Sequence, residues 1–435
     1  MLSINTIYEK KKEVEESIKN RGLKIDLDKI LELDEKYKKN LIKVESLRAE
    51  RNNISEEINK AKGAERQEKI KKAKDISNKI KKAEPDLEKE NMELQDLLYQ
   101  VPNLISKDTP QGKDEKGNKV LRKIGDPKKF DFKPKNHMEL GVLHGLIETE
   151  KSAKISGSRF NYLFKEAVLL QFALIQFGLN TLTDKKVIKE LADKVGNPFD
   201  KPFIPVVVPV MVKSSIMKKM DRFDPIEDRY YLEKDDLVLI GSAEHTLGPL
   251  HVNDILKEED LPTRYAGYST AFRREAGSYG QDTSGIIRRH QFDKLEMETF
   301  IQAEYGLKEQ ELLVAIQEYL MQKLEIPYQV VLKCTGDMGG KADFRAIDIE
   351  CFMPGEGKYR ETHTSDYMTD YQARRLNTKY KDKEGNKKFV HMNDATCFAI
   401  GRTIIAILEN YQKGDGSIEI PKALQKYMGG LKKIS

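Results

Sequence analysis

Apolar residues recur at helical spacing through the segment from about residue 26 to residue 100. The first series consists of Ile30, Leu33, Tyr37, Leu41, Val44, Leu47, Ile54 and Ile58. A second series runs from Ile70 to Leu97, and Gly63 separates the two. Because the steps are three, four or seven residues and the other positions are mostly charged, the pattern predicts two long helices paired antiparallel along a narrow seam. At about 1.5 Å per residue, helices of roughly 35 residues would extend about 50 Å, a length suited to reaching a partner.

Pro85 interrupts the second series. A proline costs roughly 3 kcal/mol inside a helix, because it lacks an amide N–H and its ring clashes with the preceding turn. We therefore expect either a kink at Pro85 or a helix that starts again there.

The pattern changes after residue 105, which we take as the end of an N-terminal domain spanning residues 1–105. Residues 106–136 are rich in Pro, Gly, Asp and Lys and predict a linker. In residues 137–435, IPVVVPVMV (204–212) predicts a strand broken by Pro209, and RYYLEKDDLVLIGSAEH (229–245) predicts a hairpin around 233–236. Further strands are expected at 328–334 and 342–353.

Three helices are expected in the same region, at 162–182, 299–325 and 395–412. The first is mainly apolar, so we expect it to be largely buried, with Phe164, Phe172 and Phe177 in the core. The predicted strands follow one another in hairpins and clusters, with helices between these groups, and this order predicts an α+β domain. Its antiparallel sheet would be flanked by helices, in contrast to a doubly wound parallel sheet.

Composition narrows the class of protein. The chain has 435 residues, of which 34% are charged and 39% hydrophobic, and its net charge is +5. Cys334, Cys351 and Cys397 have no paired or metal-ligand spacing, so we expect reduced thiols and no zinc. The charged N-terminus does not read as a signal peptide, and no apolar run approaches 18 residues. A cytoplasmic protein without a membrane span is expected.

The segment Phe272–Glu298, FRREAGSYGQDTSGIIRRHQFDKLEME, carries the clearest chemistry. It predicts two strands, the second from Gly285 onward, joined by a Gly/Ser/Asp loop. Alternation along the second strand would bring a set of mostly charged side chains to one face: Arg288, His290, Phe292, Lys294 and Glu296. Arginines beside an aromatic ring and carboxylates suit a polyanionic nucleotide better than a core, so we expect a ligand cleft.

Two later segments add to this set. KYRETHTSDYMTDYQARR (358–375) would place Glu361 and Thr364 at a strand end, and Arg402 lies near the start of the last predicted helix. Taken alone, Arg402 reads more readily as a surface charge than as a ligand of a nucleotide.

Together these segments resemble one family. FRREAGSYGQDTSGIIRRHQFDKLEME resembles motif 2 of the class II aminoacyl-tRNA synthetases, in the form found in seryl-tRNA synthetases. DATCFAIGRTIIAILENYQ is similar to motif 3, and IPVVVPVMV to motif 1, whose proline (Pro209) marks a dimer interface. GSAEHTL resembles the family's serine loop, and the N-terminal hairpin resembles the tRNA-binding arm of the bacterial type.

The resemblance implies an activity. The enzyme would activate L-serine with ATP to seryl-adenylate and transfer the seryl group to the 3′ end of tRNA(Ser). It leaves open whether tRNA(Sec) is also charged. A homodimer is implied, with Mg²⁺ entering together with ATP.

The resemblance also implies roles for residues at the ATP site. Arg273 would hold the α-phosphate and contact serine, Glu275 the adenine amino edge and Arg288 the outer phosphates. Phe292 would stack on adenine, with Arg402 against the other face of that ring or on the γ-phosphate. Glu361 and Thr364 would bind Mg²⁺ and phosphates. Of these, Arg273, Glu275 and Arg402 are the catalytic candidates.

Serine would be recognised by Ser242 and Glu244 at its amino group, and by Glu296 and Thr396 at its hydroxyl. Four positions depart from the family pattern. Ser242 replaces the common threonine, and Asp394 stands where asparagine is usual. Gln281 and Ser284 occupy loop positions that are often basic.

Two rival functions remain at this point. One is a synthetase-like ligase that charges a carrier protein, against which the intact arm argues. The other is a non-catalytic RNA-binding paralogue, against which Arg273, Glu275, Glu296, Glu361 and Arg402 argue. From periodicity alone, the helical pair also suits a partner-binding or dimerising coil.

Overall fold

The computed structural model describes residues 1–276 and 285–435. The described chain divides into two compact units, residues 1–104 and 105–435. None of the described helices combines the length and apolarity needed to cross a membrane.

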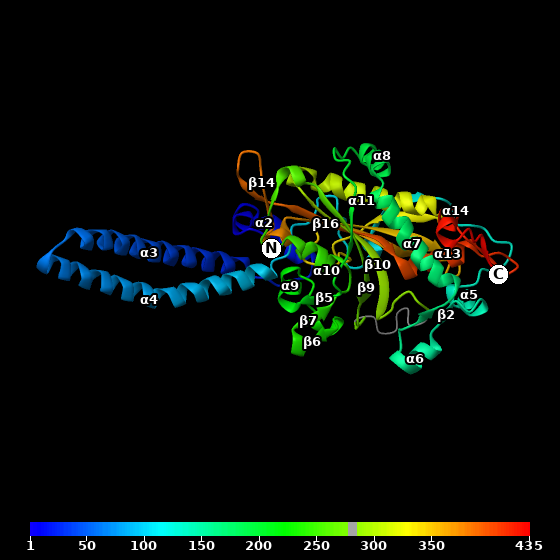
Figure 1. Ribbon diagram of the computed structural model, residues 1–435, viewed down its shortest axis with the longest axis horizontal. Coiled ribbons are helices and arrows are strands. Elements are labelled where there is room, and N and C mark those ends of the chain that lie inside the picture. Colours follow the sequence, from blue (N-terminus) through cyan, green and yellow to red (C-terminus); the bar gives the residue numbers. More distant parts are fainter. Residues whose placement is uncertain (277–284) are drawn as a thin grey trace. The chain divides into compact units, whose positions relative to one another are not determined.

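The N-terminal unit is helical and confirms the predicted helical pair (Figure 1). Short helices α1 (Ile4–Glu9) and α2 (Lys11–Asn20) precede α3 (Leu27–Lys60) and α4 (Gly63–Gln100). Asp26 caps α3 by accepting from the Lys29 amide, and Gly63 begins α4 with a positive φ of 61°. The two long helices bury Val44, Ile54, Ile76 and Ile80 along their seam.

Helix α4 runs without interruption through Pro85, so the helix does not start again there. Polar contacts on both sides of Pro85 hold α4 against α3. Asn40 donates to both carboxylate oxygens of Glu90 at 2.9 and 3.0 Å, and Arg48 lies 2.7 Å from Glu84. Pairing along the whole seam thus outweighs the local cost of one proline.

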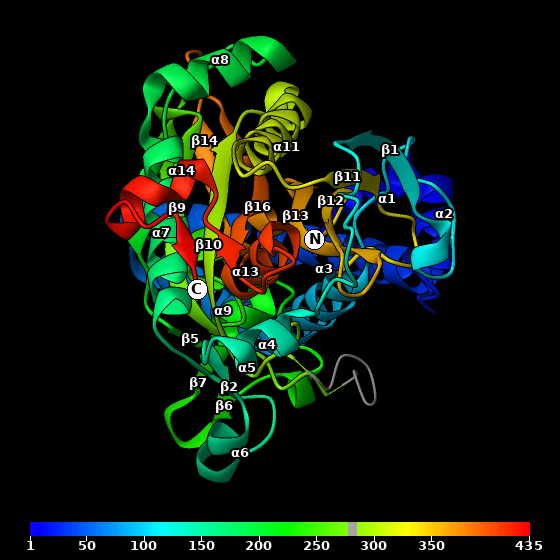
Figure 2. The same cartoon turned by 90° about the vertical axis from the view of Figure 1, so that its right-hand side faces the viewer.

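The C-terminal unit is built on an eight-stranded sheet, which confirms the α+β prediction (Figure 2). Its strands, in spatial order, are β1 (Lys119–Ile124), β11 (Tyr328–Leu332), β12 (Arg345–Met353), β13 (Lys358–Thr369), β16 (His391–Ala399), β10 (Gln291–Ile301), β9 (Thr263–Phe272) and β4 (Ile204–Val207). All neighbours are antiparallel except β4 and β9. Strand β1 lies within the expected linker, so part of that segment completes the sheet.

Helices α7 (Glu166–Thr183), α11 (Gly306–Lys323) and α13 (Ile400–Tyr411) pack on one face of this sheet and form the main core with it. Gly178 permits the close approach of α7, because a Cβ there would lie 2.6 Å from Leu295 Cδ2. The core prediction is confirmed for Phe177 but is wrong for two aromatic residues. Phe164 precedes α7 and is 44% exposed, and Phe172, on the side of α7 away from the sheet, is 58% exposed.

The structure also has two small sheets, of which the first follows the predicted pattern and the second was not predicted. Strands β5 (Met211–Lys213), β7 (Leu237–Leu239) and β6 (Tyr231–Leu232) form one, with Pro209 between β4 and β5 and the predicted hairpin between β6 and β7. Strands β8 (Ile255–Lys257), β14 (Lys379–Lys381) and β15 (Lys387–Phe389) form the other.

The remaining elements are short. The helices are α5 (His137–Leu143), α6 (Glu150–Ser156), α8 (Lys185–Val195), α9 (Ser214–Lys219), α10 (Glu244–Leu247), α12 (Tyr371–Leu376) and α14 (Lys422–Gln425). Two pairs of strands complete the fold: β2 (Ile147–Glu148) with β3 (Tyr162–Leu163), and β17 (Ile418–Glu419) with β18 (Lys433–Ile434).

Several predicted boundaries differ from the structure. The helix expected from residue 162 begins at Glu166, because residues 162–163 form β3. The strand expected from Gly285 begins only at Gln291, so Arg288 precedes it. The helices expected from residues 299 and 395 begin at Gly306 and Ile400, because strands β10 and β16 continue to Ile301 and Ala399. Each helix begins within a few residues of the end of its strand. The small and apolar residues at these junctions are compatible with a strand or with a helix, so the sequence pattern did not mark the boundary.

Candidate functional site

A cavity of about 320 Å³ lies on the face of the sheet opposite α7, α11 and α13. Leu295 and Met297 point to the helices, so the alternate residues Lys294 and Glu296 point into the cavity. Ten of the predicted site residues line it: Glu244, Arg273, Glu275, Arg288, Phe292, Glu296, Glu361, Thr364, Thr396 and Arg402. The structure therefore brings most of the predicted residues together around one cavity, from segments far apart in the chain.

Three other predicted positions lie elsewhere. Ser242 is buried just behind the cavity wall, where its Oγ lies 3.3 Å from Lys294 Nζ. His290 was expected on the ligand face, but its Nδ1 lies 3.0 Å from the Arg273 carbonyl oxygen, and the ring is not among the described groups that line the cavity. Pro209, which was predicted at a dimer interface, is likewise absent from the described lining of this cavity.

A β-bulge in β13 brings Glu361 and Thr364 to the same side of the sheet. Simple alternation would put residues three apart on opposite faces. The pairing with β12 shifts between Ile349 with His363 and Glu350 with Glu361, which leaves Thr362 as an extra residue. Glu361 and Thr364 both reach the cavity as a result, and they lie inside β13, although a strand end was expected.

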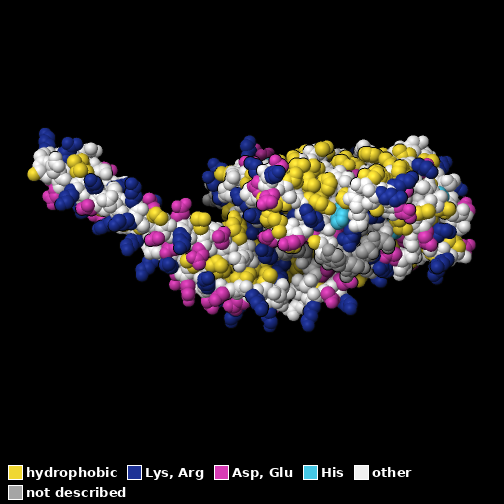
Figure 3. Space-filling model, turned by 90° about the horizontal axis from the view of Figure 1, so that it is seen from below, with side chains coloured by type: hydrophobic (Ala, Val, Ile, Leu, Met, Phe, Trp, Pro, Cys, Tyr) yellow, Lys and Arg dark blue, Asp and Glu magenta, His cyan; other side chains and the backbone are white. Residues whose placement is uncertain are grey.

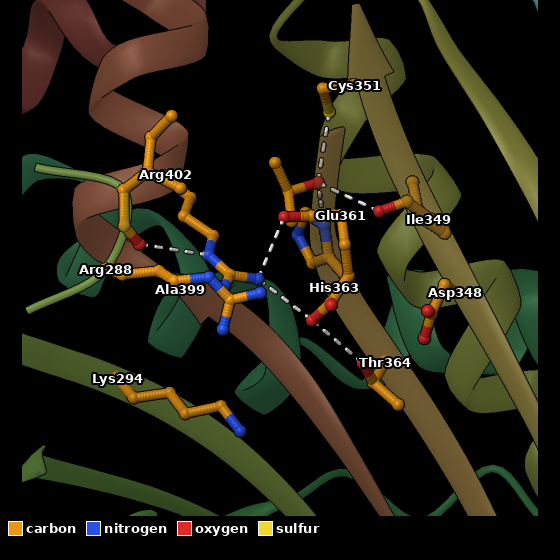
Figure 4. Close-up of polar contacts among 12 residues, drawn as sticks. Arg288, Lys294, Asp348, Ile349, Cys351, Glu361, His363, Thr364, Ala399 and Arg402 are labelled. Atoms are coloured by element: carbon orange, nitrogen blue, oxygen red, sulfur yellow. Dashed lines mark hydrogen bonds and ion pairs between the residues drawn. The ribbon is translucent and has the colours of Figure 1, made fainter. Parts of the chain in front are cut away.

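Arg402 is the third residue of α13 and closes one end of the cavity (Figure 4). Its Nη1 donates to the Glu361 carboxylate at 2.9 Å and to the Glu361 carbonyl oxygen at 3.0 Å. Thr364 donates to the same carboxylate at 3.3 Å. Burial alone would raise the pKa of Glu361, but the charges of Arg402 and Lys333 lower it to about 2, so this carboxylate is ionised at neutral pH.

Sequence reasoning missed a second ion pair beside Glu361. Lys333, just beyond β11, lies 3.3 Å from Asp348 of β12. Asp348 is 3% exposed, and its burial and the neighbouring Glu361 charge raise its pKa to about 7, against the lowering effect of Lys333. Only the pairing of β11 with β12 brings these groups together, although a carboxylate within the apolar run AIDIECF was a signal in the sequence.

Arg273, Glu275, Arg288 and Phe292 form the opposite wall. The Arg273 guanidinium lies 5.3 Å from the centre of the Phe292 ring, and its Nε donates to the Gly241 carbonyl oxygen at 3.1 Å. Arg288 donates to the Glu275 carboxylate at 3.2 Å. A planar cation beside an aromatic ring, with a carboxylate nearby, can accept a flat heterocycle and bind an adjacent phosphate.

The floor of the cavity is acidic. Lys294 Nζ lies 2.6 Å from Glu296, which is 1% exposed. Burial raises the pKa of Glu296, and the Lys294 charge opposes this rise. A buried carboxylate paired on one side can still accept a hydrogen bond from a small hydroxyl or ammonium group.

Arg222 was not predicted, yet it organises the acidic floor. Its Nε donates to Glu244 at 3.0 Å, and its Nη2 lies 3.8 Å from Asp394. Burial would raise the pKa of Glu244, but Arg222 lowers it to about 2. Arg222 follows α9 in a segment without periodic pattern, so nothing in the sequence marked it.

Asp394 lies in a row of carboxylates across three strands. It pairs with Glu298 of β10 on one side and with Asp366 of β13 on the other. Burial and these neighbours raise the pKa of Asp394 well above its ordinary value. Oxygens of Glu244, Glu296 and Asp394 all lie within 4.8 Å of one another, an arrangement that suits a small cation such as an ammonium group. Gln281 and Ser284 lie outside the described residues.

Comparison with family models divides the chain in two. Residues 1–105 match the seryl-tRNA synthetase N-terminal domain, and residues 227–411 match the tRNA synthetase class II core domain (G, H, P, S and T).

Individual relatives match the whole chain. A serine–tRNA ligase of Dictyoglomus turgidum is 41% identical over 99% of this chain and 98% of its own. One from Nitrosopumilus maritimus is 36% identical over 100% of both chains. The crystal structure of seryl-tRNA synthetase from Pyrococcus horikoshii complexed with ATP superposes with a TM-score of 0.87 at 37% identity, covering 100% of this chain and 99% of that one.

Proposed function

Because the chain belongs to the seryl-tRNA synthetase family of serine–tRNA ligases, we propose that its cavity is where L-serine and ATP form seryl-adenylate. One observation carries this proposal. The same cavity joins arginines beside an aromatic ring to a buried acidic floor, so a nucleotide and a small amino acid can lie end to end.

In the first step the serine carboxylate attacks the α-phosphate of ATP, and pyrophosphate leaves. We assign Arg273 to the α-phosphate, Glu275 and Phe292 to adenine, and Arg288 and Arg402 to the outer phosphates. No protein nucleophile is required. The rate then depends on positioning the two substrates and on stabilising the charge that develops at phosphorus.

Mg²⁺ would join the phosphates near Glu361 and Thr364. Glu361 has a low pKa, so its carboxylate is ionised, and the Thr364 hydroxyl oxygen lies 3.3 Å from it. These are two hard oxygen ligands of the kind that Mg²⁺ prefers. When bound, the ion neutralises phosphate charge. Arg402, which contacts the same carboxylate, would hold Glu361 in place before the nucleotide enters.

We assign the acidic floor to serine. Glu244 would face the ammonium group, with Ser242 behind it against Lys294, and Glu296 and Thr396 would face the hydroxyl. Alanine would leave the buried Glu296 carboxylate without the hydroxyl it requires, so alanine should be rejected strongly. Threonine would be excluded through its extra methyl group, which is a weaker discrimination.

In the second step a ribose hydroxyl at the 3′ end of tRNA(Ser) attacks the seryl carbonyl, and AMP leaves. We propose that α3 and α4 grip the body of that tRNA. Residues 66–82 of α4 support this role, because eight of them are basic and only two, Glu68 and Asp75, are acidic. The basic residues are Arg66, Lys69, Lys71, Lys72, Lys74, Lys79, Lys81 and Lys82. Figure 3 shows basic side chains, in dark blue, along the arm. Phosphate contacts of this kind position a nucleic acid and weaken as salt rises.

We also propose a homodimer in the cytoplasm. Strand β4 is an edge of the described sheet, and helix α7 contacts it. Val207 is 83% exposed, Ile204 52% and Phe172 58%. Exposed apolar side chains at a sheet edge are unfavourable in water and suit burial against a second copy of the chain. Pro209 follows this strand directly.

A charging assay tests the proposed acceptor. Full-length protein and a variant lacking residues 30–97 are compared for serine-dependent ATP–pyrophosphate exchange and for serylation of tRNA(Ser). The deletion should spare exchange and abolish charging. Exchange without charging by the full-length protein would favour a carrier protein as acceptor, and unimpaired charging by the deletion variant would refute the role of the arm.

A further inference from the structure

His137, the first residue of α5, lies between helix α13 and the segment Ile286–Arg289 that leads into β10. Its side chain is buried. The Ile286 amide donates to His137 Nε2 at 3.2 Å, and the Glu409 carboxylate lies 3.2 Å from His137 Nδ1. The imidazole therefore connects the helix that carries Arg402 to the segment that carries Arg288.

These contacts fix the tautomer of the ring. A backbone N–H can only donate, so Nε2 must be the unprotonated acceptor and Nδ1 must carry the hydrogen. Nδ1 then donates to Glu409, which is fully buried in α13. Glu409 also accepts from the His137 amide and the Gly355 amide, each at 2.9 Å. The carboxylate is thus satisfied by three N–H groups, and it holds the ring in one orientation.

Gly285 allows the close approach of the ring. Its φ is +80°, and a Cβ at this position would lie 2.1 Å from His137 Nε2. No other side chain fits without displacing the imidazole. Ile286 itself is buried in the main core, so the segment is anchored both by its side chain and by its amide.

The other side of the segment contacts Arg402. Arg402 Nε donates to the Ile287 carbonyl oxygen at 3.5 Å. The next residue is Arg288, which reaches the cavity and pairs with Glu275 at 3.2 Å. His137 on one side and Arg402 on the other therefore hold the two residues that immediately precede Arg288.

We propose that His137 is a positioning residue for the outer phosphates of ATP, acting through the Ile286 amide to place Arg288 in the cavity. This role rests on the proposed function, in which Arg288 binds those phosphates. Neither His137 nor Glu409 is among the described residues that line the cavity, so each acts only through the backbone that carries Arg288.

Two substitutions separate this role from simple packing. In His137→Asn the side-chain amide replaces Nδ1, so the variant keeps a donor for Glu409 but loses the acceptor for Ile286. In His137→Gln the amide oxygen can replace Nε2 and keep that acceptor. His144→Asn is the matched control, because His144 follows the same helix and contacts Gly416 instead.

We expect His137→Asn to raise the KM for ATP in serine-dependent ATP–pyrophosphate exchange about five- to tenfold, the effect of one lost hydrogen bond. The KM for serine should change less than about twofold, and His137→Gln should lie within about threefold of wild type. His144→Asn should match wild type. Amide hydrogen exchange at Ile286 should accelerate in His137→Asn only.

Equal behaviour of the Asn and Gln variants would overturn the inference, as would a parallel loss of ATP and serine affinity. Calorimetric titration with ATP alone gives a readout independent of the reaction. If wild type binds ATP but shows no exchange with serine, the proposed function fails and the ATP affinities of the variants still decide the role of His137. If wild type binds no ATP, both fail.

Discussion

Glu361 and Asp348 are neighbouring carboxylates on adjacent strands with opposite displacements of pKa. Arg402 and Lys333 keep Glu361 ionised, whereas burial raises the pKa of Asp348 to about 7. The cavity end that we assign to phosphates and Mg²⁺ therefore gains negative charge as pH rises through neutrality (Figure 4). The added negative charge is that of Asp348, which is not one of the expected Mg²⁺ ligands, Glu361 and Thr364.

The substitution Asp348→Asn tests this coupling. A carboxyl with a raised pKa is mostly protonated below pH 7 and mostly ionised above it, so wild type should bind Mg²⁺ more tightly at pH 8 than at pH 6. The Asn variant should lose this difference. Mg²⁺ titrations of the exchange rate at both pH values measure it. Asp337→Asn is the control, because Asp337 also lies near Lys333, at 3.5 Å, but is more exposed. An equal pH effect in wild type and Asp348→Asn would contradict the assignment.

At this scale the sequence predicted which residues line the cavity better than it predicted how they are placed. Strand alternation was sufficient for Phe292, Lys294 and Glu296. It could not place Glu361, because the extra residue at Thr362 depends on pairing with β12. Arg222 was missed for a similar reason: its partners Glu244 and Asp394 lie in distant segments.

Among the elements, the arm was the most predictable from sequence. Helices α3 and α4 bury a regular seam, so local periodicity carries nearly all the information. Strand β1 shows the opposite case. KVLRKI is charged and mostly exposed, and only its pairing with β11 makes it a strand, so the composition of its surroundings indicated a linker.

The basic stretch of α4 gives a prediction for this element. Replacing Lys71, Lys74 and Lys81 with alanine should leave ATP–pyrophosphate exchange unchanged and raise the KM for tRNA(Ser) about tenfold or more at 150 mM salt, because each lost phosphate contact weakens binding. The salt dependence of tRNA binding should also become shallower. Alanine at Lys185, Lys186 and Lys194, all on α8, gives a control of equal charge change. Equal effects of the two sets on charging would argue against a specific role for α4.

At the scale of the whole molecule, exposed apolar residues are the feature that the sequence could not anticipate. Phe172 reads as a core residue in an apolar helix, yet it is 58% exposed on the side of α7 away from the sheet. Hydrophobic periodicity predicts that a side chain is buried. It does not distinguish burial within the same chain from burial against a second copy of the chain.

A double substitution, Phe172→Glu with Val207→Glu, tests the proposed homodimer. Charges buried at an interface are strongly unfavourable, so sedimentation velocity should show a dimer for wild type and a monomer for the variant. Glutamate at Leu143 and Ile155, which are also exposed but lie on other elements, should leave the dimer intact. A wild-type monomer at micromolar concentration would refute the proposal.

The central claim is that one cavity selects serine and activates it with ATP. Serine-dependent ATP–pyrophosphate exchange, measured on wild type and Glu296→Gln without tRNA, tests it most directly. Wild type should exchange with serine and hardly at all with alanine. Glu296→Gln should lower kcat/KM for serine about 10- to 100-fold, the range for a hydrogen bond to a charged group, and leave the KM for ATP nearly unchanged. No exchange by wild type, or full activity of Glu296→Gln with serine, would contradict the account.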